Sequence, residues 1–97
     1  MSRFRLTFEA ETDLLEIETY ILQNDSVRAA RRVLQELEEG MSKVADMPGI
    51  GHVHSEVHDK ELRVWVVHSW LILYDPRPNP VVILRVLDGR RDVGQLL

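Results

Sequence analysis

The stretch that decides the fold is LRVWVVHSWLILY, at residues 62–74. It contains two runs rich in β-branched, aromatic and other apolar residues, 62–67 and 70–74, separated only by His68-Ser69. Such runs favour strands, and two residues form the commonest loop of a β-hairpin. The stretch therefore predicts two antiparallel strands joined by a tight turn.

Further strands are predicted on both sides of this hairpin. Residues 75–80 contain three prolines, which lack the amide hydrogen that a sheet ladder needs, so this segment is a turn. Residues 81–87, VVILRVL, resume the strand pattern, and Asp88-Gly89 begin another turn. Near the start of the chain, Phe4 and Leu6 alternate with polar residues and predict a short first strand.

Two amphipathic segments lie between the first strand and the hairpin, with apolar residues at helical spacing. The first stripe is Ala10, Leu14, Ile17 and Ile21, and the second is Ala30, Val33, Leu34, Leu37, Met41, Val44 and Ala45. Thr7 is placed to cap the first helix, and Asp25 or Ser26 to cap the second. We therefore predict one α+β domain over residues 1–97, in the order β-α-α-β-β-β, with a helical hairpin packed on a mainly antiparallel four-stranded sheet.

Composition restricts the setting in which the chain works. No apolar run approaches the roughly 20 residues of a membrane-spanning helix, and the N-terminus does not resemble an export signal. Cysteine is absent, which excludes disulfides, thiol catalysis and cysteine-bound metals and suits a reducing compartment. We therefore expect a cytoplasmic protein with no membrane role.

Charge is unevenly distributed along the chain, whose formal net charge is −4. Residues 1–59 carry 6 Lys and Arg against 12 Asp and Glu, whereas residues 60–97 carry 6 against 4. Proteins that bind nucleic acids through phosphates usually have a large basic excess. We therefore expect no strong direct binding of nucleic acid by the chain alone.

The segment 52–61 contains His52, His54, Glu56 and His58, residue types that bind zinc. Their spacing is loose, and the segment offers no evident scaffold that would hold them in a fixed geometry. We interpret it as a solvated surface loop and expect no metal and no other cofactor.

Four short motifs occur in order along nearly the whole chain. Residues 13–21, DLLEIETYI, look like D-L-x-x-I-x-x-Y-I, and residues 44–51, VADMPGIG, are similar to L-A-x-x-P-x-x-G. Leu62-Arg63 and WLILY at 70–74 resemble L-R and Y-x-I-x-Y, and residues 83–92, ILRVLDGRRD, resemble I-L-R-V-L-H-G-x-R-D. Each motif is weak alone, but their order and placement make a strong combined signal. The chain therefore resembles the ParE/RelE toxins of bacterial toxin–antitoxin pairs, also called plasmid stabilisation systems, and its ParE branch in particular.

The resemblance implies one of two activities. A ParE-like toxin inhibits DNA gyrase and is neutralised in a hetero-oligomer by a ParD-like antitoxin, whose tail folds over the helical hairpin and the sheet edge. A RelE-like toxin is a ribosome-dependent mRNA endonuclease, which needs a proton acceptor, a proton donor and cations around one phosphate. We expect the first activity, with no catalytic residues, because residues 92–97 lack the tyrosine that follows the basic motif in RelE-like sequences. A third interpretation is an inactive module that only binds antitoxin.

The hairpin, the last strand and the tail supply the candidate target-binding residues. They are Arg63, Tyr74, Arg85, Asp88, Arg90 and Arg91. A purely structural alternative is that Arg85 and Asp88 pair with each other at a sheet edge, that the two terminal arginines are solvated, and that Tyr74 fills the core.

Three positions depart from the family pattern. Trp70 replaces a tyrosine, Asp75 stands where an arginine is common, and Asp88 stands where a histidine is usual. The two aspartates reduce positive charge, which disfavours the chemistry of a nuclease and leaves the fold prediction intact.

Overall fold

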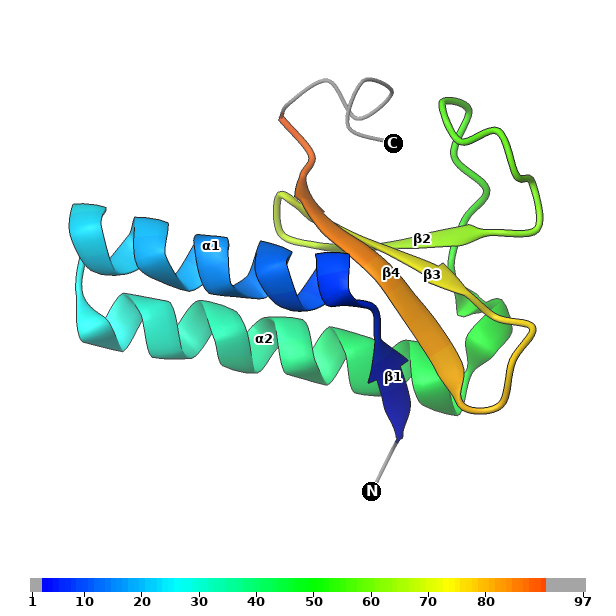
Figure 1. Cartoon of the computed structure of the whole chain (residues 1–97), viewed down its shortest axis with the longest axis horizontal. Helices are drawn as coiled ribbons and strands as arrows, with labels where there is room; N and C mark the ends of the chain where they lie inside the picture. Colours follow the sequence, from blue (N-terminus) through cyan, green and yellow to red (C-terminus); the bar gives the residue numbers. More distant parts are fainter. Residues whose placement is uncertain (1–2, 91–97) are drawn as a thin grey trace.

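The computed structural model describes residues 3–90 and contains the predicted elements in the predicted order (Figure 1). They are β1 (Phe4–Leu6), α1 (Phe8–Asn24), α2 (Val27–Asp46), the short 3-10 helix η1 (Pro48–Ile50), β2 (Arg63–Val67), β3 (Trp70–Asp75) and β4 (Val81–Asp88). The order across the sheet is β1-β4-β3-β2. β2, β3 and β4 are antiparallel, whereas β1 is parallel to β4, so the sheet is mixed with a mainly antiparallel body.

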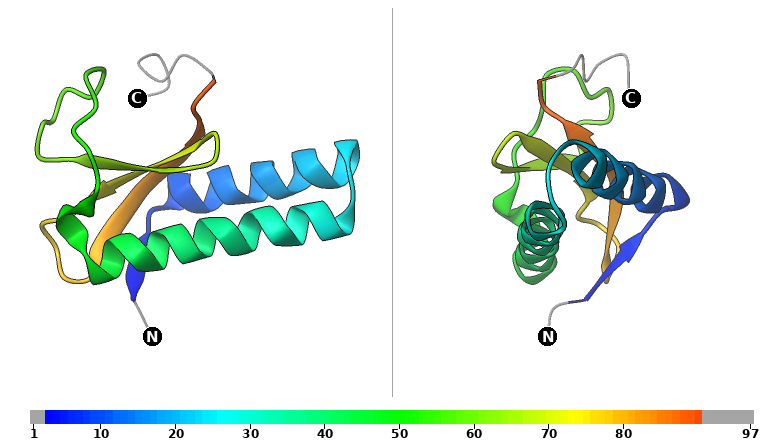
Figure 2. Two further views of the ribbon diagram at one scale, coloured as in Figure 1. Left: turned by 180° about the vertical axis from the view of Figure 1, so that it is seen from behind. Right: turned by 90° about the vertical axis from the view of Figure 1, so that its left-hand side faces the viewer.

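The two helices lie side by side as a hairpin and cover one face of the sheet (Figure 2). Each begins at a side-chain cap that the sequence predicts. Thr7 Oγ1 accepts a hydrogen bond from Ala10 N, and Ser26 Oγ accepts one from Ala29 N, both at 3.0 Å. The largest fully buried side chains between the layers are Leu37, Val44, Ile72, Tyr74 and Ile83.

Segment 52–61 is mostly exposed, as predicted for a solvated surface loop, but it is attached to the sheet at two points. His52 and Val64 exchange two main-chain hydrogen bonds of 2.8 and 2.7 Å at the outer edge of β2. Val57 is buried together with Val64 and Leu73 in a second, smaller core. Its polar neighbours concealed this role, since one isolated apolar residue has no period.

Gly40 allows α2 to pack closely against the hairpin. A Cβ atom at this position would lie 2.6 Å from Val67 Cγ2 and 3.1 Å from Ile72 Cδ1. Glycine costs a helix interior about 1 kcal/mol relative to alanine. Here it makes room for two core side chains of the sheet.

β4 contains an irregularity that positions the candidate site. Leu73 lies opposite Arg85, whereas Tyr74 lies opposite Ile83, so Leu84 is an extra residue in β4. The bulge shifts the alternation of side chains, and both Ile83 and Val86 pack in the main core. Since β1 pairs only with residues 81–83, the neighbouring edge of β4 beyond Ile83 is left to α1.

Candidate partner-binding groove between α1 and β4

Beyond the end of β1, side chains of α1 and of its cap residue form hydrogen bonds with the main chain of β4. Thr7 Oγ1 donates a 2.8 Å hydrogen bond to the carbonyl oxygen of Leu84. One turn and a half further on, Asp13 Oδ2 accepts a 2.9 Å hydrogen bond from the amide of Val86. Buried main-chain groups are costly without partners. These two contacts therefore hold the first half of α1 against the strand.

The same aspartate binds the guanidinium of Arg85. Arg85 Nε donates to Asp13 Oδ2 at 2.7 Å, and Arg85 Nη2 donates to Asp13 Oδ1 at 2.8 Å. Asp13 is the one buried charged residue within residues 3–90. The hydrogen bonds to Asp13 raise the pKa of Arg85 above its ordinary value, so the guanidinium stays charged.

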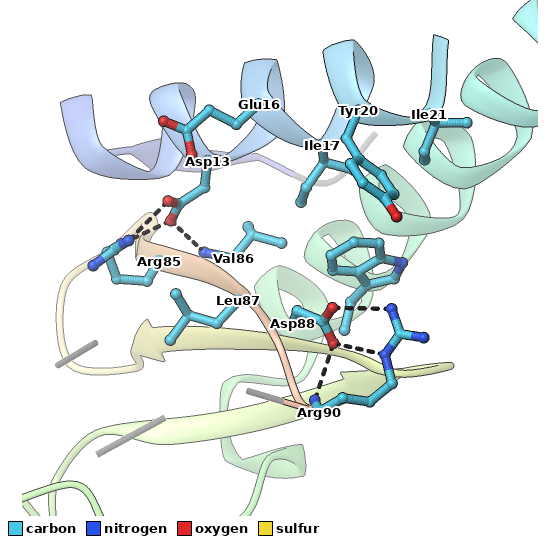
Figure 3. Close-up of a pocket in the computed structure, with 11 residues that line it drawn as sticks. Asp13, Glu16, Ile17, Tyr20, Ile21, Arg85, Val86, Leu87, Asp88 and Arg90 are labelled. Atoms are coloured by element: carbon cyan, nitrogen blue, oxygen red, sulfur yellow. Dashed lines mark hydrogen bonds and ion pairs between the residues drawn. The ribbon is translucent and has the colours of Figure 1, made fainter. Parts of the chain in front are cut away.

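A groove of about 660 Å³ opens beside this pair, between α1 and the second half of β4 (Figure 3). Its lining residues are Asp13, Glu16, Ile17, Tyr20, Ile21, Trp70, Arg85, Val86, Leu87, Asp88 and Arg90. Tyr20 and Glu16 are exposed, whereas Ile17 and Ile21 are buried at its floor. The groove thus combines an apolar floor with acidic and aromatic walls, which is suited to a protein segment.

Arg90 and Asp88 form the mouth of the groove (Figure 3). Asp88 Oδ1 accepts hydrogen bonds from the amide and Nε of Arg90 at 3.0 and 3.1 Å, and Asp88 Oδ2 accepts one from Arg90 Nη2 at 3.0 Å. The hydrogen bond to Asp88 raises the pKa of Arg90 above its ordinary value. The Arg90 side chain is 72% exposed, so its cation is accessible from outside the molecule.

Tyr74 and Arg63 have a structural role at the other end of the hairpin. The Tyr74 hydroxyl donates to the carbonyl oxygen of Pro48 at 2.6 Å and accepts from the amide of Gly51 at 2.9 Å. Arg63 Nη1 donates to the carbonyl oxygen of Gly51 at 3.3 Å. Tyr74 is fully buried, and burial raises the pKa of its phenol. These contacts tie η1 and the residue that follows it to the sheet.

The structure divides the six predicted target-binding residues into groups. Arg85, Asp88 and Arg90 line one groove. Arg63 and Tyr74 face each other at the far end of β3, roughly 13 Å along the strand from the residue paired with Asp88. Arg91 lies outside the described residues. Tyr74 has no surface to offer a partner, in agreement with the structural alternative for that residue.

The structural alternative for Arg85 and Asp88 is wrong about their partners, although both residues do lie on the stretch of β4 that β1 does not reach. Arg85 binds Asp13, and Asp88 binds Arg90. Our sequence reasoning missed Asp13 as a site residue. One signal was available, because Asp13 falls on the apolar stripe of α1, where an unpaired carboxylate would be costly.

The histidines of segment 52–61 do not converge. His52 stacks on Trp65 with ring centroids 6.4 Å apart, and Lys43 Nζ lies 5.7 Å from the same Trp65 ring. Among residues 3–90, no three His, Cys, Asp or Glu side chains are grouped so as to hold a metal ion. None of the helices in that range is sufficiently long and apolar to cross a membrane.

A helical hairpin on a four-stranded mixed sheet, in the order β-α-α-β-β-β, places the protein in the class of ParE/RelE-type domains. A family model described as the ParE toxin of the type II toxin–antitoxin system parDE matches residues 4–93. The chain therefore belongs to the ParE toxin family of type II toxin–antitoxin systems.

Known relatives agree with this assignment. Toxin ParE3 of Caulobacter vibrioides is 30% identical over 97 residues, which cover 100% of this chain and 96% of that protein. A solved chain described as the chromosomal ParDE TA system from P. aeruginosa is similar in fold, with a TM-score of 0.73 and 16% identity. The match covers 89% of this chain and 94% of the solved one.

Proposed function

We propose that this ParE-family toxin acts in the cytoplasm by inhibiting DNA gyrase, and that a ParD-like antitoxin neutralises it in a hetero-oligomer. The observation that supports the proposal most directly is the family match, which spans residues 4–93 and names a parDE system. ParE-like toxins, as the resemblance implies, act on gyrase through an interaction surface rather than a catalytic constellation.

The antitoxin binds in the groove between α1 and β4. An amphipathic or extended tail that folds on binding places apolar side chains over Ile17 and Ile21 and cationic side chains beside Glu16. Tyr20 and Trp70 supply aromatic contact area, which is enriched at the centres of protein interfaces. Occupation of the groove also covers Arg90 at its mouth.

The cation at the mouth of the groove is part of the surface that contacts gyrase. Within residues 3–90, three of the predicted target-binding residues form ion pairs, and Arg90 has the most exposed side chain of the three. Asp88 orients its guanidinium through two side-chain hydrogen bonds. Neutralisation then follows from steric overlap, since antitoxin and target use the same end of β4.

Two variants on opposite faces of α1 test the docking site. Glu16→Lys with Tyr20→Ala changes two exposed groove residues, and Glu11→Lys with Phe8→Ala makes the same changes on the outer face. We expect the groove variant to weaken antitoxin binding by roughly tenfold or more, as for loss of a central aromatic contact, and the outer variant to leave it unchanged. Equal loss in both variants would refute docking in the groove.

A second assay tests the target. Purified toxin added to gyrase is expected to inhibit supercoiling, and the antitoxin encoded beside the toxin is expected to restore it. Cleavage of mRNA on translating ribosomes, without an effect on gyrase, would favour the RelE-like activity instead. Antitoxin binding without any toxicity would favour the inactive module.

A further inference from the structure

α1 carries a second apolar stripe, on the face turned away from the core. Phe8, Leu15 and Leu22 are 78%, 62% and 45% exposed and are spaced seven residues apart. Seven residues return to nearly the same side of a helix, with a drift of about 20° per heptad. The three side chains therefore form a line of roughly 21 Å along the helix axis.

This outer stripe is separate from the groove. At about 100° per residue, Leu15 points roughly 140° away from the mean direction of the core residues Ile17 and Ile21. Tyr20, which lines the groove, lies on the core side as well. A partner on the outer stripe therefore approaches α1 from the side opposite to the proposed antitoxin site.

The outer face of α2 gives a measure of how unusual this stripe is. Between Arg28 and Glu39, the exposed positions of α2 are polar or charged, as expected for a helix face in water. α1 instead supplies four of the eight large hydrophobic residues that are exposed within residues 3–90, namely Phe8, Leu15, Tyr20 and Leu22. Three of these four form the outer stripe, which makes it a candidate interaction surface.

The charges around the stripe indicate what covers it. α1 contains five carboxylates and no Lys, Arg or His. Glu11 and Glu18 lie between the stripe residues, and no ion pair within residues 3–90 involves either of them. A helix with an apolar seam and flanking carboxylates is complementary to a helix with an apolar seam and flanking cations.

A second copy of the chain does not meet this requirement. Glu11 and Glu18 lie on the same side of the outer stripe, so two stripes packed antiparallel would bring them next to the same carboxylates of the other copy, where like charges repel. Two stripes packed parallel would place them beside Thr12 and Thr19 of the other copy, which are not cations. The basic first turns of α2 expose a single large apolar residue, Val27, so residues 3–90 contain no basic apolar helix face to fill the role.

We propose that the outer face of α1 docks a basic amphipathic helix of another protein, at the same time as the antitoxin occupies the groove. The partner contributes apolar residues at heptad spacing, which pack on Leu15 and its neighbours, and Lys or Arg side chains beside Glu11 and Glu18. The toxin–antitoxin complex is thereby able to recruit a third chain.

The probe is a 21-residue synthetic helix with Leu at heptad positions and Lys at the flanking positions, compared with a matched peptide that has Glu in place of Lys. Fluorescence anisotropy is measured on the free toxin and on its antitoxin complex. We expect the basic peptide to bind both the free toxin and the antitoxin complex. The acidic peptide should bind each of them with an affinity lower by about tenfold or more. Loss of binding to the antitoxin complex would overturn the proposal, since the antitoxin would then cover the stripe.

Variants of the toxin locate the contact. Leu15→Ser is expected to weaken the basic peptide by about tenfold or more, since one Leu is no longer buried, whereas Val66→Ser on β2 is the exposed apolar control. Glu11→Gln with Glu18→Gln is expected to reduce the salt dependence of binding, and Glu38→Gln with Glu39→Gln on α2 is its control. Equal binding of both peptides, no effect of Leu15→Ser, or a toxin dimer that Leu15→Ser dissociates would each refute the proposal.

Discussion

Asp13 on α1 and Arg85 on β4 are joined by two hydrogen bonds of 2.7 and 2.8 Å, while the same carboxylate accepts the amide of Val86. The buried Asp13 carboxylate thus pairs with the Arg85 guanidinium and also accepts a hydrogen bond from a main-chain amide of β4 that has no neighbouring strand on that side. The contact links elements separated by about seventy residues of sequence and forms one wall of the groove. Its removal should affect folding and the site together.

Asp13→Ala is expected to lower the free energy of unfolding by about 2–4 kcal/mol, because the amide of Val86 is left without its acceptor and Arg85 without its partner. The measurement is urea denaturation followed by circular dichroism. Glu11→Ala, an exposed carboxylate on the same helix, is the matched control and should change stability by less than about 0.5 kcal/mol. Equal effects in both variants would show that the buried bonds add nothing beyond helix charge.

Tyr74→Phe is expected to cost about 1–3 kcal/mol of stability, because the buried amide of Gly51 and carbonyl of Pro48 lose the hydroxyl that joins them. Tyr20→Phe, at an exposed tyrosine, is the control and should be close to neutral. The two variants are compared by thermal melting at neutral pH. A neutral Tyr74→Phe would mean that ordered water replaces the hydroxyl.

The raised pKa of Tyr74 adds a dependence on alkaline pH. Burial keeps this phenol protonated in the folded state above the ordinary value of 10.0, at which the unfolded chain titrates. The stability that the protonated Tyr74 phenol contributes is therefore fully present below pH 10. It is lost as the pH rises through the pKa of Tyr74 in the folded state, because the unfolded state releases its proton first. Stability measured between pH 9 and 12 should decline less in Tyr74→Phe than in the wild type.

Local sequence patterns were sufficient for most of the fold. The period of the apolar residues and the caps at Thr7 and at Asp25 or Ser26 predicted both helices, and residues 62–74 predicted the hairpin. The parallel pairing of β1 with β4 was beyond such patterns. It joins residues 4–6 to residues 81–83, and nothing within three residues of sequence specifies a partner so far away.

The groove was only partly predictable, for a similar reason. Arg85, Asp88 and Arg90 were recognised as a group because they are close in sequence. Their common wall with α1 depends on the bulge at Leu84, and a bulge changes which residues share a face without leaving a mark on composition. Tyr74 was grouped with them by motif, although its hydroxyl serves the core.

Gly40→Ala is expected to destabilise the protein by about 1–3 kcal/mol, despite the better helix propensity of alanine, since the new methyl group overlaps Val67 in a packed interface. Gly49→Ala is the control, because a Cβ atom there meets no heavy atom within 4 Å, and its effect should stay within about 0.5 kcal/mol. Chemical denaturation of both variants checks the difference. A Gly40→Ala protein that is more stable than the wild type would show that the neighbouring side chains of the sheet move aside for the new methyl group at little cost.

Replacement of Arg90 and Arg91 by alanine is expected to separate toxicity from folding. The Arg90 side chain is exposed and follows the last strand, so the double variant should change stability by no more than about 0.5 kcal/mol. It should still bind antitoxin, because the floor and walls of the groove remain, yet lose inhibition of growth and of gyrase supercoiling.

Arg28→Ala with Arg31→Ala, two exposed arginines on α2, is the matched control for loss of positive charge and should remain toxic. Thermal melting and antitoxin titration are paired with supercoiling and cleavage-complex assays. A double variant that is folded, binds antitoxin and stays fully toxic would exclude the two arginines from the effector surface and direct attention to Arg63 and Arg85.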